Sequence, residues 1–75
     1  APAARVVLSR QETLAATRYA AGDPLGTVAR AMRLSPHTAK QYVDRAKAKY
    51  RAAGRPCPTR VHLYRHLVDD GLIAG

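Results

Sequence analysis

Apolar side chains recur along this chain at intervals of three and four residues, the spacing that places them on one face of an α-helix. No stretch has the strict alternation of apolar and polar residues that is typical of a half-buried strand. Gly and Pro interrupt the pattern at a few points and divide the chain into four segments of helical character. The pattern therefore predicts an all-α fold of four helices.

The first two helices have clear opening signals. Ser9 and Glu12 have the spacing of a capping box, in which each side chain accepts a hydrogen bond from the backbone amide of the other. Gly22 is expected to end the first helix, because glycine tolerates the left-handed conformation that follows a last turn. Asp23 is expected to cap the second helix, with Pro24 in its first turn. The expected buried faces of these two helices consist of Leu14, Ala15, Ala16, Tyr19, Ala20, Val28, Ala29 and Met32.

The connection between the second and third helices is short. Leu34 is expected to close the second helix and to fill the core, and Ser35 and Pro36 supply a capping hydroxyl followed by a proline. So tight a connection forces the two helices to cross steeply, as in a helix-turn-helix. The third helix is expected to run from Pro36 to about Ala52, before Gly54. Its predicted buried stripe is Ala39, Val43, Ala46 and Tyr50.

The C-terminal part predicts a linker and a fourth helix. Residues 55–58 contain two prolines too close together to lie inside a helix. Thr59 is expected to cap a helix that runs to about Asp70 and stops at Gly71. The predicted apolar stripe of this helix is Val61, Tyr64, Leu67 and Val68, and Leu72 and Ile73 are expected to fold back on the core.

Positive charge is concentrated in the middle of the chain. The 75 residues have a net charge of +8, and residues 30–65 contain ten Lys and Arg against a single acidic residue, Asp44. Such a block on a small folded domain indicates a polyanionic partner, most simply nucleic acid. The length predicts one domain over residues 8–75, with residues 1–7 as a linker or a remnant of processing. Because the chain starts at Ala1, further parts are expected upstream.

Several protein classes are not expected. A single cysteine excludes an internal disulfide, and no apolar run approaches the roughly 20 residues of a membrane span. No signal peptide is recognisable, so a cytoplasmic protein is expected. Cys57, His62 and His66 are a candidate metal site, because His residues four positions apart share a helix face. One Cys between prolines is a weak third ligand, however, and surface residues near a dimer contact are the preferred interpretation. No metal, cofactor or enzymatic activity is predicted, because no catalytic pair of residues is apparent.

The polar face of the third helix contains the candidate binding chemistry. Gln forms bidentate bonds with adenine, Lys donates to guanine or phosphate, and Asp accepts from the cytosine amino group. The residues expected to contact bases are His37, Lys40, Gln41 and Asp44. Those expected to contact phosphates are Arg33, Ser35, Thr38, Arg45, Lys47, Lys49 and Arg51. The alternative is that this face is only solvated, which is the usual role of a polar helix face.

The segment Val28-Ala29-Arg30 through Leu34-Ser35-Pro36-His37-Thr38-Ala39-Lys40, followed by Tyr42-Val43, resembles the LuxR-type helix-turn-helix of the NarL/FixJ family of bacterial transcription regulators. Leu8-Ser9, Glu12 and Gly22 match the first helix of the same family pattern, and Gly71-Leu72-Ile73 matches its usual ending. The resemblance implies a response-regulator effector domain of a two-component system, which binds double-stranded DNA with its third helix. It also implies a homodimer through the fourth helix, in some cases only on DNA. The residues expected at that contact are Val61, Tyr64, Arg65 and Val68.

The sequence departs from the family pattern at several positions. Ala39 stands where Val is usual, Tyr42 replaces a frequent His, and Asp44 replaces a residue that is commonly basic or neutral. Two alternative functions stay open. One is a promoter-binding domain like region four of sigma factors, which works with RNA polymerase. The other is a protein-interaction module whose basic charge only keeps it in solution.

Overall fold

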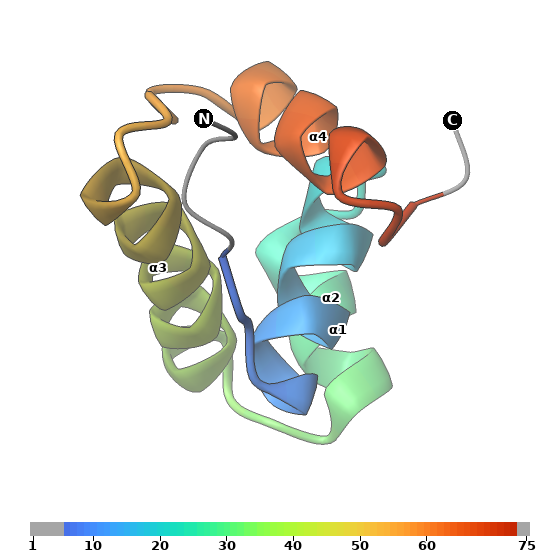
Figure 1. Cartoon of the computed structure of the whole chain (residues 1–75). Helices are drawn as coiled ribbons and strands as arrows, with labels where there is room; N and C mark the ends of the chain where they lie inside the picture. The colour runs from blue at the N-terminus through green and yellow to red at the C-terminus, as the bar shows by residue number, and fades with distance from the viewer. Residues whose placement is uncertain (1–5, 74–75) are drawn as a thin grey trace.

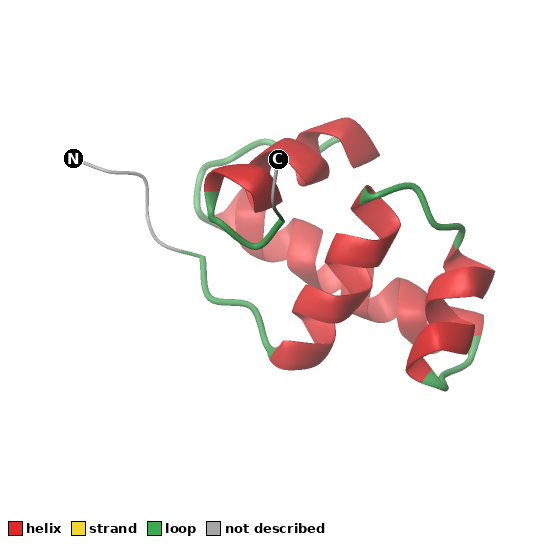
Figure 2. Cartoon of the chain, turned by 90° about the vertical axis from the view of Figure 1, so that its right-hand side faces the viewer, coloured by secondary structure: helices red, strands yellow, loops and turns green. Residues whose placement is uncertain are grey.

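The computed structural model describes residues 6–73, and all regular secondary structure in this range is helical (Figure 2). The four helices are α1 (Arg10–Ala20), α2 (Leu25–Met32), α3 (Pro36–Ala52) and α4 (Arg60–Asp69). The prediction of an all-α fold of four helices is confirmed. Of the expected N-terminal linker, residues 1–5 lie outside the described range, and Val6 and Val7 have no regular structure.

Helix α1 begins and ends as its sequence predicts. The Ser9 hydroxyl accepts from the Glu12 amide at 3.2 Å, and the Glu12 carboxylate accepts from the Ser9 amide at 2.8 Å, which completes the capping box. Gly22 follows the helix with a φ of 117°, in the range that favours glycine. Leu14 was expected in the core but is 38% exposed. At 100° per residue it lies opposite the buried Ala16 on the helix.

The start of helix α2 differs from the prediction. Pro24, not Asp23, is the N-cap residue, and no side chain caps the helix. The Asp23 amide donates to the Arg18 carbonyl at 3.1 Å, so the turn that ends α1 already determines the position of Asp23. Arg33 ends α2 in the left-handed conformation, with a φ of 57°. The expectation that Leu34 fills the core is wrong, because this side chain is only half-buried.

Helix α3 has the predicted bounds. The Ser35 hydroxyl accepts from the Thr38 amide at 3.2 Å, and Pro36 occupies the first turn. Gly54 follows the helix with a φ of 78°. The predicted stripe is confirmed, since all four of its residues are buried: Ala39, Val43, Ala46 and Tyr50.

The capping of helix α4 is confirmed, but its predicted buried face is only partly right. The Thr59 side chain accepts from the His62 amide, and Gly71 follows the helix with a φ of 77°. Leu67 is buried as expected, and Leu63, one turn earlier, is the second buried residue. Val61 is 74% exposed, Tyr64 is exposed, and Val68 is half-buried. Leu63 precedes Leu67 by four residues, which is the spacing of one helix face, whereas Val61 lies on the opposite side.

Helix α1 is the centre of the packing, because it contacts each of the other three helices. Helices α2 and α3 also pack against each other and are joined by only three residues, 33–35 (Figure 1). At the C-terminal end, Ile73 packs against the core as expected, whereas Leu72 is 42% exposed. This packing leaves one side of α3 and one side of α4 exposed.

A polar cluster connects the end of α3 to the end of α4. The Tyr50 hydroxyl donates to the Asp70 carboxylate at 3.0 Å, and the Arg55 guanidinium donates to both Asp70 oxygens at 2.9 and 3.0 Å. The His66 ring stacks on Tyr50 with its centroid 5.1 Å away. Burial, followed by the hydrogen bond to Asp70 and its charge, raises the pKa of Tyr50 well above its ordinary value. These contacts hold α4 at a defined place on α3.

Candidate nucleic-acid interface

The four residues expected to contact bases lie together on the exposed side of α3. His37, Lys40, Gln41 and Asp44 are all exposed, and their spacing of three and four residues places them on one face. The buried stripe from Ala39 to Tyr50 occupies the opposite side of the helix. We call these four exposed residues the α3 polar face. No other described segment buries it.

The side chains of the α3 polar face are paired with one another along the helix. The Lys40 ammonium donates to the Asp44 carboxylate at 2.7 Å. This hydrogen bond, together with the Asp44 charge, raises the pKa of Lys40 above its ordinary value. The Gln41 amide nitrogen lies 3.2 Å from Nε2 of His37. The donor and acceptor roles in this contact depend on the tautomer of the His37 ring.

The start of α3 is held by two hydroxyls that were expected to contact phosphate. Ser35 Oγ and Thr38 Oγ1 are 2.9 Å apart, and Ser35 also caps the helix. Ser35 is exposed and Thr38 is half-buried. Arg33, also an expected phosphate contact, is exposed in the left-handed turn just before Ser35. The hydrogen bonds of Ser35 and Thr38 thus fix the first turn of α3, and the exposed Arg33 lies two residues before Ser35.

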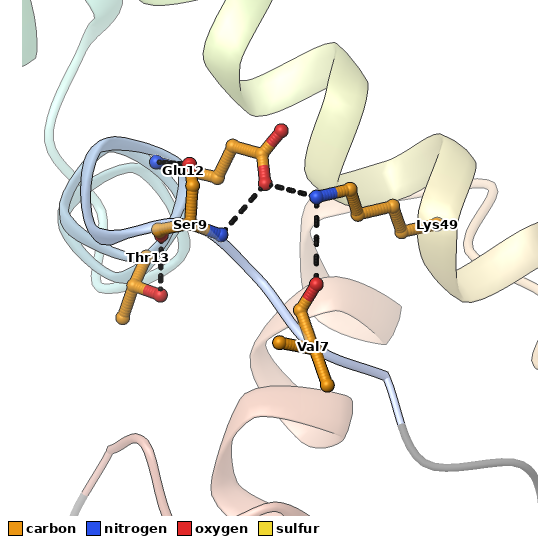
Figure 3. A network of polar contacts seen from close by, with 5 residues as sticks. All are labelled: Val7, Ser9, Glu12, Thr13 and Lys49. Carbon is orange, nitrogen blue, oxygen red and sulfur yellow. Dashed lines mark hydrogen bonds and ion pairs between the residues drawn. The ribbon is translucent and has the colours of Figure 1, made fainter.

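Lys49 forms an intramolecular ion pair that the sequence reasoning did not foresee (Figure 3). Its ammonium lies 2.5 Å from the carboxylate of Glu12, which is only 5% exposed, and 3.4 Å from the Val7 carbonyl. Burial by itself raises the pKa of Glu12, but the hydrogen bonds from Lys49 and Ser9 and the Lys49 charge together lower it below its ordinary value. Lys49 therefore takes part in the fold of the N-terminal segment.

The remaining expected phosphate contacts lie on the flanks of α3 or near its end. Arg45 lies over the Tyr42 ring, 5.7 Å from its centroid, and Lys47 lies over the Tyr19 ring at 5.3 Å. Arg51 is exposed in the last turn. Within residues 6–73, none of these three cations forms an ion pair. Arg60, which the sequence reasoning did not single out, lies 4.2 Å from the Tyr19 centroid.

The residues expected at a dimer contact line one shallow groove on α4. Its volume is about 390 Å³, and its walls are Val61, Tyr64, Arg65, Val68 and Asp69. Val61 and Tyr64 are both exposed, Val61 to 74% and Tyr64 to 37%. The groove lies on the side of α4 that faces away from the buried Leu63 and Leu67.

The three residues weighed as a metal site are used differently. Cys57 is buried, which corrects the expectation of a surface residue, and burial raises the pKa of its thiol. His62 bonds the Thr59 hydroxyl at 2.7 Å, and His66 bonds the Pro56 carbonyl at 2.7 Å. In the part of the chain that the structure describes, no three His, Cys, Asp or Glu side chains are grouped to hold a metal. No described helix is both long and apolar enough to cross a bilayer.

Comparisons with protein-family models, with curated proteins and with solved structures found no match.

Proposed function

We propose that this chain is a helix-turn-helix domain that binds double-stranded DNA in a sequence-specific manner, with α3 in the major groove. The observation that carries the proposal is the exposed α3 polar face on a helix with a capped start, within a strongly basic domain. An α-helix fits the major groove, where each base pair presents a distinct set of donors and acceptors.

In the proposed complex, residues of the α3 polar face would contact the bases, and the cations around this face would contact the phosphates. Gln41 would read adenine, Lys40 guanine or a phosphate, and Asp44 the cytosine amino group. Arg33, Arg45, Lys47 and Arg51 would bind phosphates and supply much of the affinity, which should then fall steeply with salt. No step of this function requires a cofactor, a metal or catalysis.

We further propose that the domain acts in a bacterial, cytoplasmic transcription regulator of the LuxR type, as the resemblance implies. The groove on α4 supports a homodimer through this helix. Two copies would place their α3 helices on half-sites about one turn of duplex apart.

The most informative experiment is the selection of bound oligonucleotides from a random pool. We expect enrichment of a defined sequence with two related half-sites. Selection repeated with Gln41→Ala should lose the preference at one position, at a cost of about 1–3 kcal/mol for the matched sequence. Arg51→Ala should weaken binding to all sequences alike, because a phosphate contact carries no base information.

Other outcomes would favour the alternatives. If both variants lose affinity equally on every sequence, the proposed division between base and phosphate contacts is wrong. The α4 groove also fits a protein-interaction module, which would not retain DNA at physiological salt. Binding that depends on added RNA polymerase would favour a domain like region four of sigma factors.

A further inference from the structure

We propose that Arg60 of α4, together with Lys47 of α3, forms a binding site for a backbone phosphate of the DNA duplex, and that Tyr19 positions both cations. The inference rests on the DNA binding proposed above and extends it. It adds α4 to the DNA contact and assigns a role to an aromatic residue that does not itself bind the DNA.

The site is formed where three helices meet. Tyr19 lies near the end of α1 and is half-buried, so its ring is anchored by the core. The Arg60 guanidinium lies 4.2 Å and the Lys47 ammonium 5.3 Å from the centroid of this ring. Both distances are within the range of a cation–π interaction. One anchored ring therefore restrains two long side chains that would otherwise sample many rotamers.

Lys47 and Arg60 are two unpaired cations that share one ring, whereas three other cations of the described chain already have a counter-charge. Lys40, Lys49 and Arg55 are each neutralised by a carboxylate, those of Asp44, Glu12 and Asp70 respectively. Lys47 and Arg60 form no ion pair within residues 6–73, and the ring that holds them carries no net charge. Two positive charges over one ring, neither of them paired with a carboxylate in the described chain, create a local potential that an anion would relieve.

The site lies where the proposed complex needs a phosphate contact. Lys47 follows Lys40 by two helical turns, so both lie along the same edge of the α3 polar face. Arg45, held by Tyr42, lies on the other edge of the helix. The major groove is about 12 Å wide and has a phosphate strand on each side, so a helix inside it meets phosphates on both flanks. A ring-held cation is thus available at each flank.

The test compares two single charge removals on the whole chain. Arg60→Ala removes a charge from the proposed site, and Arg18→Ala removes the same charge from an exposed position on α1. Binding of each to a labelled duplex of random sequence is followed by fluorescence anisotropy between about 50 and 200 mM salt. Arg60→Ala should bind roughly five- to ten-fold more weakly at 100 mM salt, with a salt slope smaller by about 0.9. Arg18→Ala should change neither quantity appreciably.

The role of Tyr19 is tested by the nature of its substitute. Tyr19→Phe keeps the ring and should bind like the wild type, whereas Tyr19→Leu loses the ring and should approach the affinity of Arg60→Ala. Thermal unfolding of both variants separates loss of folding from loss of positioning. If Tyr19→Leu does not fold, the comparison of Arg60→Ala with Arg18→Ala still decides whether the phosphate site exists.

Two results would overturn the inference, and only one of them also overturns the proposed DNA binding. If the wild type binds the duplex but both arginine variants have equal affinities and slopes, only the phosphate site is wrong. If the wild type does not bind duplex DNA even at the lowest salt, the proposed DNA binding fails and this site fails with it.

Discussion

Glu12 shows how a single residue connects local and tertiary structure. Its carboxylate completes the capping box of α1 and also pairs with Lys49, 37 positions along the chain. A buried carboxylate destabilises a fold unless it has hydrogen-bonding partners of suitable charge. Glu12 has them from Ser9 and Lys49, so its burial is compatible with a stable N-terminal segment.

The lowered pKa of Glu12 predicts a pH-dependent contribution to stability. Glu12→Gln should lower the free energy of unfolding by about 1–2 kcal/mol at pH 7, because a charge-assisted hydrogen bond is lost. The folded-state pKa of Glu12 lies below that of the unfolded chain, so its stabilisation is present above about pH 4.3 and is lost as the pH falls through the folded-state pKa. Urea unfolding of the wild type and of Glu12→Gln between pH 3 and pH 7 is the measurement. The difference between their free energies of unfolding should become smaller as the pH falls.

Lys49→Met removes the other partner of the Glu12–Lys49 ion pair. It leaves the Glu12 carboxylate buried beside Ser9 alone, so destabilisation should be largest at neutral pH and should be relieved when acid neutralises Glu12. A pH-independent effect of both variants would contradict the account of this ion pair.

At the scale of the helix, the start of α3 determines how the α3 polar face is presented. Among the described residues, Ser35 is the side chain that caps this helix, because its hydroxyl accepts a hydrogen bond from the Thr38 amide. The preceding turn places Arg33 in a left-handed conformation. Loss of the cap would therefore loosen the end of α3 that carries His37.

Ser35→Ala should lower the free energy of unfolding by about 1 kcal/mol, because the Thr38 amide loses its acceptor. Ser35→Asp keeps an acceptor at the same place and should be close to the wild type. Thermal or urea unfolding of the three proteins is the measurement. Equal stability of the alanine and aspartate variants would show that the cap contributes little.

In the proposed complex with DNA, Asp44 would oppose binding that does not depend on the base sequence. It holds Lys40 at 2.7 Å and would be repelled by a misplaced phosphate. Asp44→Asn should therefore increase affinity for random-sequence duplex by roughly three- to ten-fold at low salt, and the advantage of the selected sequence should shrink. Asp23→Asn removes the same charge from the turn before α2, outside both the α3 polar face and the α4 groove, and serves as the control. Anisotropy titrations with the random-sequence duplex and with the selected duplex give the ratio of the two affinities for each protein. If the control variant gains more affinity for the random-sequence duplex than Asp44→Asn does, this role of Asp44 is contradicted.

At the scale of the whole molecule, α1 organises the fold and leaves two separate surfaces exposed. Helices α2 and α3 pack on α1 and on each other, and α4 packs on α1 and is connected to α3 through Tyr50 and Asp70. The α3 polar face and the groove on α4 thus belong to different helices. The proposed DNA contact and the proposed dimer contact would therefore not compete for the same surface.

Val61→Glu tests the proposed dimer contact at little cost to the fold, because this side chain is 74% exposed. We expect unchanged unfolding but loss of the dimer on DNA, since a carboxylate would be buried in the apolar contact. Val7→Glu is a matched control, because Val7 is equally exposed and lies outside the groove. Sedimentation of each protein with a two-half-site duplex gives the stoichiometry. If Val61→Glu still binds as a dimer, α4 does not form the contact.

Most of the helix boundaries could be predicted because they depend on neighbouring residues. The caps of α1, α3 and α4 each join a hydroxyl to an amide three positions later, and glycines follow these helices. The prediction failed at α2, where the turn that ends α1 determines the position of Asp23. Exposure of the α3 polar face could also be predicted, because helical periodicity places it opposite the buried stripe from Ala39 to Tyr50.

The sequence by itself determined the four helices and the two sides of α3, since caps, glycines and periodicity act over a few residues. Only the tertiary structure decided which distant side chains meet: Lys49 with Glu12, Arg60 with Tyr19, and Arg55 with Asp70. It also decided that Leu63, and not Val61, faces the core. The physical reason is that these contacts depend on how the helices pack against one another, which no local pattern specifies.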